Sequence, residues 1–126
     1  MAYYETIHLV AGDDKPELNF VLRDSNTAAS GVNLDPDDST TWAPIDISDP
    51  TIVVKFRKLG TTATLDTMTC VKVAPYTDGA CFMQWNATTL DVTAGIYEGE
   101  IELTYTNGRV MTLFDLLKFK VRGEFE

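Results

Sequence analysis

Few residue types in this chain can carry out chemistry, and their spacing fits neither a catalytic triad nor a metal centre. The 126-residue chain holds one histidine and two cysteines. His8 lies between Ile7 and Leu9 in a segment that predicts a strand, so a Ser-His-Asp or Cys-His centre would depend on it alone. A structural zinc site takes four Cys or His ligands, more than the chain holds. Cys70 and Cys81 form no Cys-x-x-Cys pair, and we expect two buried thiols, with a disulfide left open.

Carboxylates are the remaining candidates for acid and base catalysis. Glu98, Glu100 and Glu102 alternate along one expected strand face, where paired carboxylates could serve as general acid and general base. Lys118 and Lys120 stand on the outward face of the following strand. Cross-strand charge pairs therefore account for the pattern without catalysis, and we predict that the chain is not an enzyme.

A second group of acidic residues lies in a segment with loop chemistry. Asp35, Asp37 and Asp38 carry hard oxygen ligands of the kind that calcium binds. Their spacing fails as an EF-hand loop, because Thr40 stands where that loop needs glycine and Asp46 where it needs glutamate. No glycine-rich segment precedes a predicted helix, so nothing is expected to cradle nucleotide phosphates. We predict no metal and no cofactor.

The charge of the chain limits the kinds of partner. Nineteen acidic against ten basic residues give a formal net charge of -9. Nucleic acid would therefore meet repulsion instead of counterion release, and so would an anionic membrane surface. No apolar run approaches the roughly 20 residues that span a bilayer. The N-terminus shows no basic stretch followed by an apolar one, so no secretory signal is predicted and synthesis in a cytoplasm is expected.

Alternation with period two predicts the strands that would position these side chains. The clearest case runs from Tyr97 to Tyr105, with an apolar face and an acidic, solvated face. Asn107-Gly108 follows, a strong hairpin signal for which a type I′ turn is expected. The returning strand carries Asp115 in its apolar row, so we expect an irregularity near residues 114 to 116.

Turn signals at Lys58-Leu59-Gly60 and at residues 75–79 predict two further hairpins. If the second of these turns sets the register, Cys70 lies nearer Trp85 than Cys81. The predicted strands lie at residues 5–10, 17–23, 52–57, 62–65, 67–74, 80–85, 97–105 and 110–122.

Residues 24–50 are rich in Asp, Ser, Asn and Pro and predict one long loop, attached to the body at Trp42 and at residues 45–47. Loops of this length are often functional. The short, turn-punctuated strands predict an all-β chain with one domain over residues 1–126. The predicted fold is a single antiparallel immunoglobulin-like β-sandwich of about seven or eight strands, with a small barrel as second choice. Aromatic and acidic side chains expected near the surface give the candidate protein-interface residues Tyr3, Tyr4, Asp35, Asp37, Trp42 and Tyr76.

Several segments together carry a family resemblance. Tyr4-Glu5-Thr6-Ile7-His8-Leu9-Val10-Ala11-Gly12-Asp13, followed by Pro16-Glu17-Leu18 and Leu22-Arg23-Asp24, resembles the N-terminal domain of upper baseplate proteins of tailed phages. Residues 42–46, 53–60, 94–101 and 114–122 look like later strands of the same family, so the resemblance covers nearly the whole chain.

The resemblance implies an immunoglobulin-like sandwich that serves as a building block of the virion, where the protein would be located. It implies other phage virion proteins as partners in a symmetric assembly with multiple copies per particle, and no enzyme activity. Fold likeness alone does not fix function.

Two alternatives remain at this stage. Upper baseplate proteins of this family generally continue into coiled or receptor-binding-adaptor regions, whereas this chain stops at Glu126. Similar small sandwiches decorate phage capsids, so capsid decoration is the alternative within the virion. A carbohydrate-binding module is the alternative of another class, and it would need exposed aromatic side chains in a row.

Overall fold

Strands dominate the described part of the chain, together with two short 3-10 helices. The computed structural model describes residues 6–113 and 116–123. The helices are η1 (Ser39–Thr41) and η2 (Tyr76–Asp78). The strands are β1 (Ile7–Val10), β2 (Leu18–Val21), β3 (Arg23–Ala28), β4 (Trp42–Pro44), β5 (Thr51–Lys58), β6 (Asp66–Thr69), β7 (Val71–Lys72), β8 (Ala80–Met83), β9 (Gly95–Thr104), β10 (Val110–Thr112) and β11 (Leu117–Arg122).

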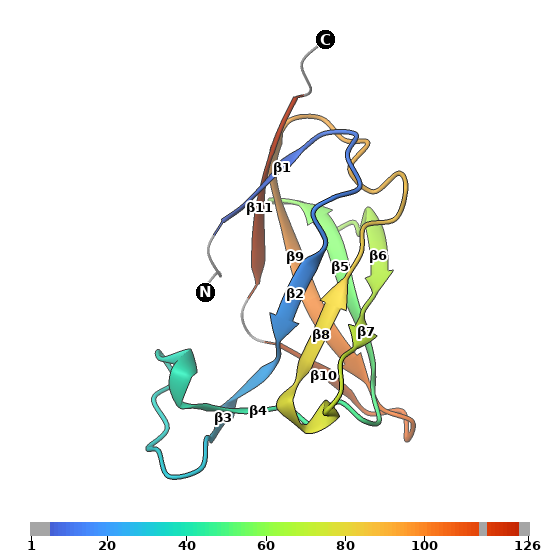
Figure 1. Cartoon of the computed structure of the whole chain (residues 1–126). Coiled ribbons are helices and arrows are strands. Elements are labelled where there is room, and N and C mark those ends of the chain that lie inside the picture. Colours follow the sequence, from blue (N-terminus) through green and yellow to red (C-terminus); the bar gives the residue numbers. More distant parts are fainter. Residues whose placement is uncertain (1–5, 114–115, 124–126) are drawn as a thin grey trace.

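Two sheets form the body of the molecule (Figure 1). The larger sheet has the order β1-β11-β9-β5-β6, with β10 paired to β9, and the smaller sheet has the order β2-β8-β7. Strands β3 and β4 form a separate two-stranded sheet at one end. The predicted all-β sandwich is therefore confirmed.

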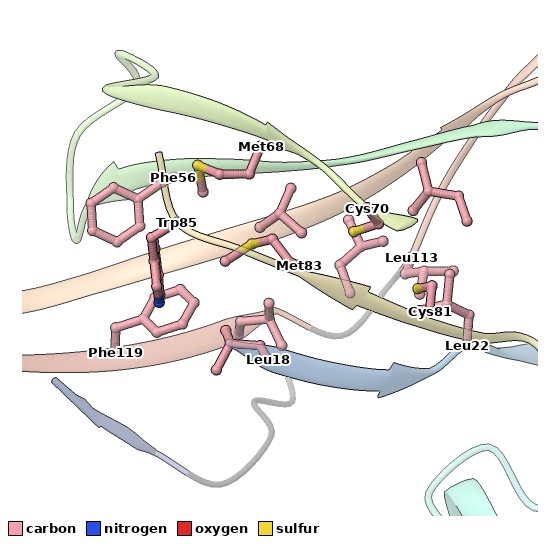
Figure 2. Packing of buried hydrophobic residues seen from close by; sticks show 14 of the residues in the cluster. Leu18, Leu22, Phe56, Met68, Cys70, Cys81, Met83, Trp85, Leu113 and Phe119 are labelled. Carbon is pink, nitrogen blue, oxygen red and sulfur yellow. The ribbon is translucent and has the colours of Figure 1, made fainter. Parts of the chain in front are cut away.

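The core between the sheets follows from the alternation seen in the sequence. Every second residue is buried from Ile52 to Phe56 in β5 and from Tyr97 to Leu103 in β9, because successive side chains of a strand point to opposite faces. The rings of Phe56, Trp85, Tyr97 and Phe119 pack together in this core, and Figure 2 shows Phe56, Trp85 and Phe119 at one end of it. Phe56 stacks on Tyr97 with ring centroids 5.1 Å apart and meets Trp85 and Phe119 at 5.6 Å each.

The strand count and one pairing differ from the prediction. The described residues hold eleven strands in place of seven or eight. The segments predicted as single strands at 17–23, 67–74 and 110–122 are each divided in two, and β4 lies inside the segment predicted as a loop. The expected strand at 62–65 is an exposed turn. Strand β1 pairs with β11 in parallel, so the sandwich is not purely antiparallel. A tight turn would force the two strands to run antiparallel. These strands are not joined by one, so they can pair in parallel.

Cys70 lies where the chain passes from the larger sheet to the smaller one, between β6 and β7. Both cysteines are buried free thiols, and Figure 2 shows them in the same part of the core, away from Trp85. The neighbouring Cys81 thiol and burial raise the pKa of the Cys70 thiol above its usual range. The expectation that Cys70 lies nearer Trp85 than Cys81 is wrong. The loop of this hairpin is residues 74–79 rather than 75–79, which moves the register by one residue.

The chain reverses at Asn107-Gly108 as predicted, but the turn is not of type I′. A type I′ turn needs a positive φ at both central residues. Gly108 has a φ of +87°, whereas none of the described non-glycine residues has a positive φ. The Gly108 N–H donates to the Tyr105 carbonyl at 2.9 Å, and the Tyr105 N–H donates to the Arg109 carbonyl at 2.8 Å. This pattern is typical of a three-residue loop that ends in a left-handed glycine.

The irregularity expected near residues 114 to 116 is visible in the register of the flanking strands. Thr112 lies opposite Glu102 and Leu117 lies opposite Gly99. The segment between β10 and β11 therefore holds two more residues than the stretch of β9 that it faces. Phe114 and Asp115 themselves lie outside the described residues.

The long loop predicted at 24–50 is shorter than expected. Residues 23–28 and 42–44 form the paired strands β3 and β4, so the connecting loop is residues 29–41. The composition of β3 is polar, and its sequence shows no apolar alternation that would have predicted a strand. Backbone pairing with β4 and a hydrogen bond from the Thr27 hydroxyl to Asp24, at 2.9 Å, hold it instead.

Asp66, at the start of β6, is expected to make the stability depend on pH. Its carboxylate accepts hydrogen bonds from the Thr89 hydroxyl at 2.5 Å and the Asn86 amide at 3.1 Å. The Thr89 bond, the largest cause, lowers the pKa of Asp66. A depressed folded-state pKa contributes stability above the unfolded pKa of about 3.9, and this stability is lost as the pH falls through the folded value.

We therefore expect Asp66→Asn to lower the free energy of unfolding by about 1 kcal/mol near neutral pH, measured in urea. The difference between the variant and the original chain should shrink as the pH falls through the lowered folded-state pKa of Asp66, because both then carry an uncharged group at this position. Asp13→Asn, at an exposed position, is the matched control and should leave stability unchanged. If Asp66→Asn lowered the free energy of unfolding by the same amount at neutral and at acidic pH, the charge of Asp66 would not be the cause of the loss.

Candidate interaction surfaces

The loop of residues 29–41 projects from β3 and β4 at one end of the sandwich (Figure 1). The Ala29 N–H donates to the Thr41 carbonyl at 2.8 Å and closes its base. Inside the loop, the Thr41 hydroxyl donates to the Asp38 carbonyl at 2.7 Å. Residues 30–40 are all exposed. The loop is thus an exposed element whose shape is fixed by its own hydrogen bonds.

Acidic side chains gather on this loop. Asp35 and Asp37, both expected at an interface, are exposed, and the Asp35 carboxylate accepts the Asp37 N–H at 2.9 Å. The hydroxyl and then the backbone N–H of Thr40 lower the pKa of Asp38. The loop therefore presents ionised carboxylates, which suit a partner with basic groups.

Trp42 holds the loop to the body and is not available for contact. Its side chain is only 6% exposed, and its indole N–H donates to the Asp35 carbonyl at 2.9 Å. The expected attachment at Trp42 is confirmed, whereas its placement among the interface candidates does not fit this burial.

The other aromatic candidates lie elsewhere. Tyr76 is in η2, between β7 and β8, and is 42% exposed. The Lys72 ammonium lies 6.0 Å from the centroid of its ring. Tyr3 and Tyr4 lie outside the described residues. The structure thus places Asp35 and Asp37 in the loop 29–41 and Trp42 beside them at the start of β4, and it leaves Tyr76 in a different turn.

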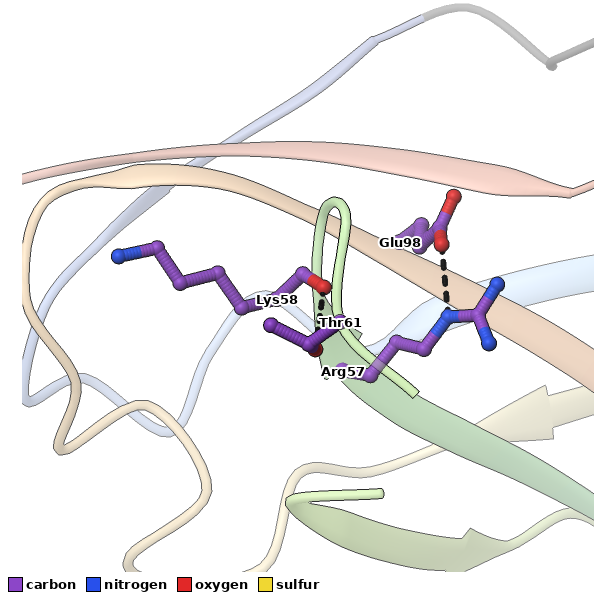
Figure 3. A network of polar contacts seen from close by, with 4 residues as sticks. All are labelled: Arg57, Lys58, Thr61 and Glu98. Atoms are coloured by element: carbon purple, nitrogen blue, oxygen red, sulfur yellow. Dashed lines mark hydrogen bonds and ion pairs between the residues drawn. The ribbon is translucent and has the colours of Figure 1, made fainter. Parts of the chain in front are cut away.

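The acidic face of β9 is neutralised by β5. Arg57 Nε lies 2.6 Å from Glu98 Oε1 (Figure 3), and Lys55 Nζ lies 2.9 Å from Glu102 Oε2. The hydrogen bond and the charge of Glu102 raise the pKa of Lys55. Glu98 is only 5% exposed, so the expectation of a fully solvated acidic face is wrong at this position.

The expected partners of these carboxylates were Lys118 and Lys120. The register places Lys118 opposite Glu98, but it places Lys120 opposite Ile96. The short ion pairs come from β5, the other neighbour of β9. Local sequence could connect β9 with the strand that follows it through a turn signal, but it gave no sign that β5 would lie on the other side.

The space beside these carboxylates is small. The cavity has a volume of about 40 Å³, enough for on the order of one to three water molecules. Its lining residues are Lys55, Arg57, Thr64, Glu98, Gly99, Glu100 and Leu116. The arrangement serves to neutralise charge across two strands.

Arg57→Leu is expected to cost more stability than Lys55→Leu. The Glu98 side chain is 6% exposed and the Glu102 side chain 21% exposed, so a lost contact is less well replaced by water at Glu98. We expect about 1–2 kcal/mol for Arg57→Leu and a smaller loss for Lys55→Leu, from unfolding in uncharged urea. An equal or larger loss at Lys55 would contradict this order.

A basic pocket that the sequence analysis did not anticipate opens where β1 and β11 pair. Its volume is about 370 Å³, and His8, Leu9, Val10, Lys120 and Arg122 line it. The parallel register sets His8 opposite Lys120 and Val10 opposite Arg122. Such a pocket can accept an anionic group such as a carboxylate. Its residues come from opposite ends of the chain, and no turn signal could have joined them.

The described residues show no cluster of three or more His, Cys, Asp or Glu side chains that could hold a metal ion. Within the same residues, no helix has the length and apolar character needed to cross a membrane.

Comparison with protein-family models and with curated proteins yields no match. Among solved structures, this chain is similar to the crystal structure of CopC from Methylosinus trichosporium OB3b. The similarity covers 96% of this chain and 87% of that chain, with a TM-score of 0.45 and 7% sequence identity. A likeness this distant carries nothing about function.

Proposed function

We propose that this chain is a non-enzymatic structural protein of a tailed-phage virion, an assembly module of the tail or baseplate that attaches to other virion proteins. The placement of the segments that resemble upper baseplate proteins carries the proposal. Residues 4–13, 53–60, 94–101 and 114–122 contribute to β1, β5, β9 and β11, which are neighbours in the order β1-β11-β9-β5. These four resembling segments therefore fall on one continuous sheet, whereas those at 16–18, 22–24 and 42–46 reach β2, β3 and β4 of the other two sheets.

In this role the sandwich supplies a rigid body, and exposed elements supply the contacts. The loop 29–41 offers carboxylates, and Tyr76 offers an aromatic ring at a different turn. Many copies in a symmetric particle gain avidity through effective concentration, so each contact can be weak. A carbohydrate-binding role has less support, because Trp42 and Trp85 are both buried at 6% exposure.

The test is cryo-electron microscopy of purified phage particles that carry a labelled copy of this protein. We expect ordered density at the tail or baseplate. Density over the capsid would overturn the tail placement and support the decoration alternative. Absence of the protein from the particle would overturn membership in the virion.

A loop replacement tests the contact role of residues 29–41. The hydrogen bond between Ala29 and Thr41 allows residues 30–40 to be replaced by a short Asn-Gly turn. We expect this variant to fold and to lose incorporation into particles. A glycine-serine replacement of equal length at residues 61–64, an exposed turn, is the control. Normal incorporation of the loop variant would show that the loop is not a contact element, while membership in the virion would stand.

A further inference from the structure

The outer face of the smaller sheet is apolar, although it faces solvent. Leu18, Cys81 and Met83 are buried in the core, so the alternate residues of β2 and β8 point outward. Val21 and Val71 are each 50% exposed and Val73 is 42% exposed. We name this surface the apolar face; it consists of Asn19, Val21, Val71, Val73, Ala80 and Phe82.

The register arranges the apolar face in two rows. In one row Phe82 lies between Asn19 and Val71, its partners on the two neighbouring strands. In the other row Ala80 lies opposite Val21, and its carbonyl accepts the Val73 N–H at 2.9 Å. A half-buried phenyl ring therefore rises in the middle of one row. The small alanine leaves a depression in the middle of the next row.

The shape of the apolar face is complementary to itself. Phe82 and Ala80 are two residues apart on β8, a separation of roughly 7 Å on the same face of a strand. A two-fold axis that passes between them places Phe82 of each copy over Ala80 of the other. An isologous contact of this kind needs one patch that is complementary to itself, which a projection and a depression on one strand provide.

The distribution of charge also favours a second copy of the chain as the partner of the apolar face. The chain has a formal net charge of -9, yet the apolar face contains no ionisable side chain. Two copies can therefore meet here without burying a charge, which would cost several kcal/mol per ion. We infer that the apolar face binds the same face of a second copy of this chain. This inference rests on the proposed function, whose symmetric assembly supplies many copies.

The contact should be weak and should strengthen with salt. Three short strands present less surface than the roughly 800 Å² per partner of a standard interface. The negative charges of two copies repel each other across the contact, and salt screens that repulsion. A partner bound through opposite charges would show the reverse dependence.

Sedimentation equilibrium of the purified chain tests the inference, from micromolar to millimolar concentration at low and high salt. We expect a monomer–dimer equilibrium that shifts toward the dimer at high salt. Val21→Asp and Val71→Asp should each weaken dimerisation by at least about tenfold, a change of about 1.4 kcal/mol. Val110→Asp is the matched control, because Val110 is 57% exposed on the larger sheet, and it should change nothing.

Three results would overturn the inference: a monomer at every concentration, patch variants that dimerise like the original chain, or a control that dimerises as weakly as they do. In a mixed sample of labelled and unlabelled chains, an intermolecular nuclear Overhauser effect should join the Phe82 ring to the Ala80 methyl group. Its absence at high concentration would exclude the two-fold arrangement. If the chain stays monomeric in solution but is found in particles, this inference is wrong and the proposed function stands. If the chain dimerises but is absent from particles, the proposed function is wrong and this inference stands.

Discussion

Replacing Phe56 by alanine is expected to lower the free energy of unfolding by about 3–5 kcal/mol, a large share of the total stability of a domain. Phe56 is fully buried, and its ring packs against three other aromatic rings. Alanine would remove the apolar surface of the ring and leave a cavity that the neighbouring strands cannot close. Urea unfolding, followed by tryptophan fluorescence from Trp85 and Trp42, measures the change.

Two further variants serve as references for the stability loss of Phe56→Ala. Phe56→Leu keeps most of the side-chain volume and should cost roughly half as much as Phe56→Ala. Leu59→Ala removes an apolar side chain that is 45% exposed in the turn directly after the same strand, and it should change stability by less than about 0.5 kcal/mol. If Phe56→Ala costs no more than Leu59→Ala, the aromatic cluster does not hold the sheets together.

Gly79→Ala is expected to cost more than about 3 kcal/mol, or to prevent folding. A Cβ at this position would lie 2.5 Å from the Leu22 carbonyl oxygen and 3.1 Å from the Ile45 carbonyl oxygen. The same backbone groups form a hydrogen-bonded junction. The Leu22 N–H donates to the Gly79 carbonyl and the Ile45 N–H donates to the Leu22 carbonyl, each at 2.9 Å. The clash would therefore push apart three chain segments that meet through backbone bonds.

Gly60→Ala and Gly108→Ala separate this clash from backbone strain. Gly60, Gly79 and Gly108 have φ values of +83°, +72° and +87°, but a Cβ at 60 or at 108 would meet nothing within 4 Å. These two controls should each cost about 1–2 kcal/mol, the penalty for a left-handed conformation. If Gly79→Ala lowered the free energy of unfolding by no more than the two controls do, the backbone junction would accommodate the added Cβ without further loss of stability. The same unfolding curves measure all three variants.

Period-two alternation was sufficient to predict the fold class, because the apolar faces of the future β5 and β9 are present in the local sequence. It could not predict how the sheets divide the strands. The change of sheet at Cys70 depends on packing, and the polar strand β3 is held by backbone pairing with β4. Turn composition located the hairpins, but one additional residue in the loop 74–79 moved the register of β7 against β8 by one residue.

The candidate surfaces were predictable to a smaller extent. Loop composition placed Asp35 and Asp37 on an exposed loop, yet it could not show that Trp42 turns inward to bond the Asp35 carbonyl. The basic pocket of His8, Lys120 and Arg122 depends on contacts between strands far apart in the chain. Such contacts are set by topology, which local patterns do not specify.

The parallel pairing of β1 with β11 also determines how the domain would respond to tension. Their register joins four residue pairs, from Ile7 with Phe119 to Val10 with Arg122. Force applied before Ile7 and after Arg122 would pull the two strands along their length in opposite directions. The hydrogen bonds between them would then be loaded together in shear, whereas pulling at one shared end of an antiparallel pair opens the bonds one after another. A domain connected through both ends would therefore resist stretching at the edge where its first and last strands meet.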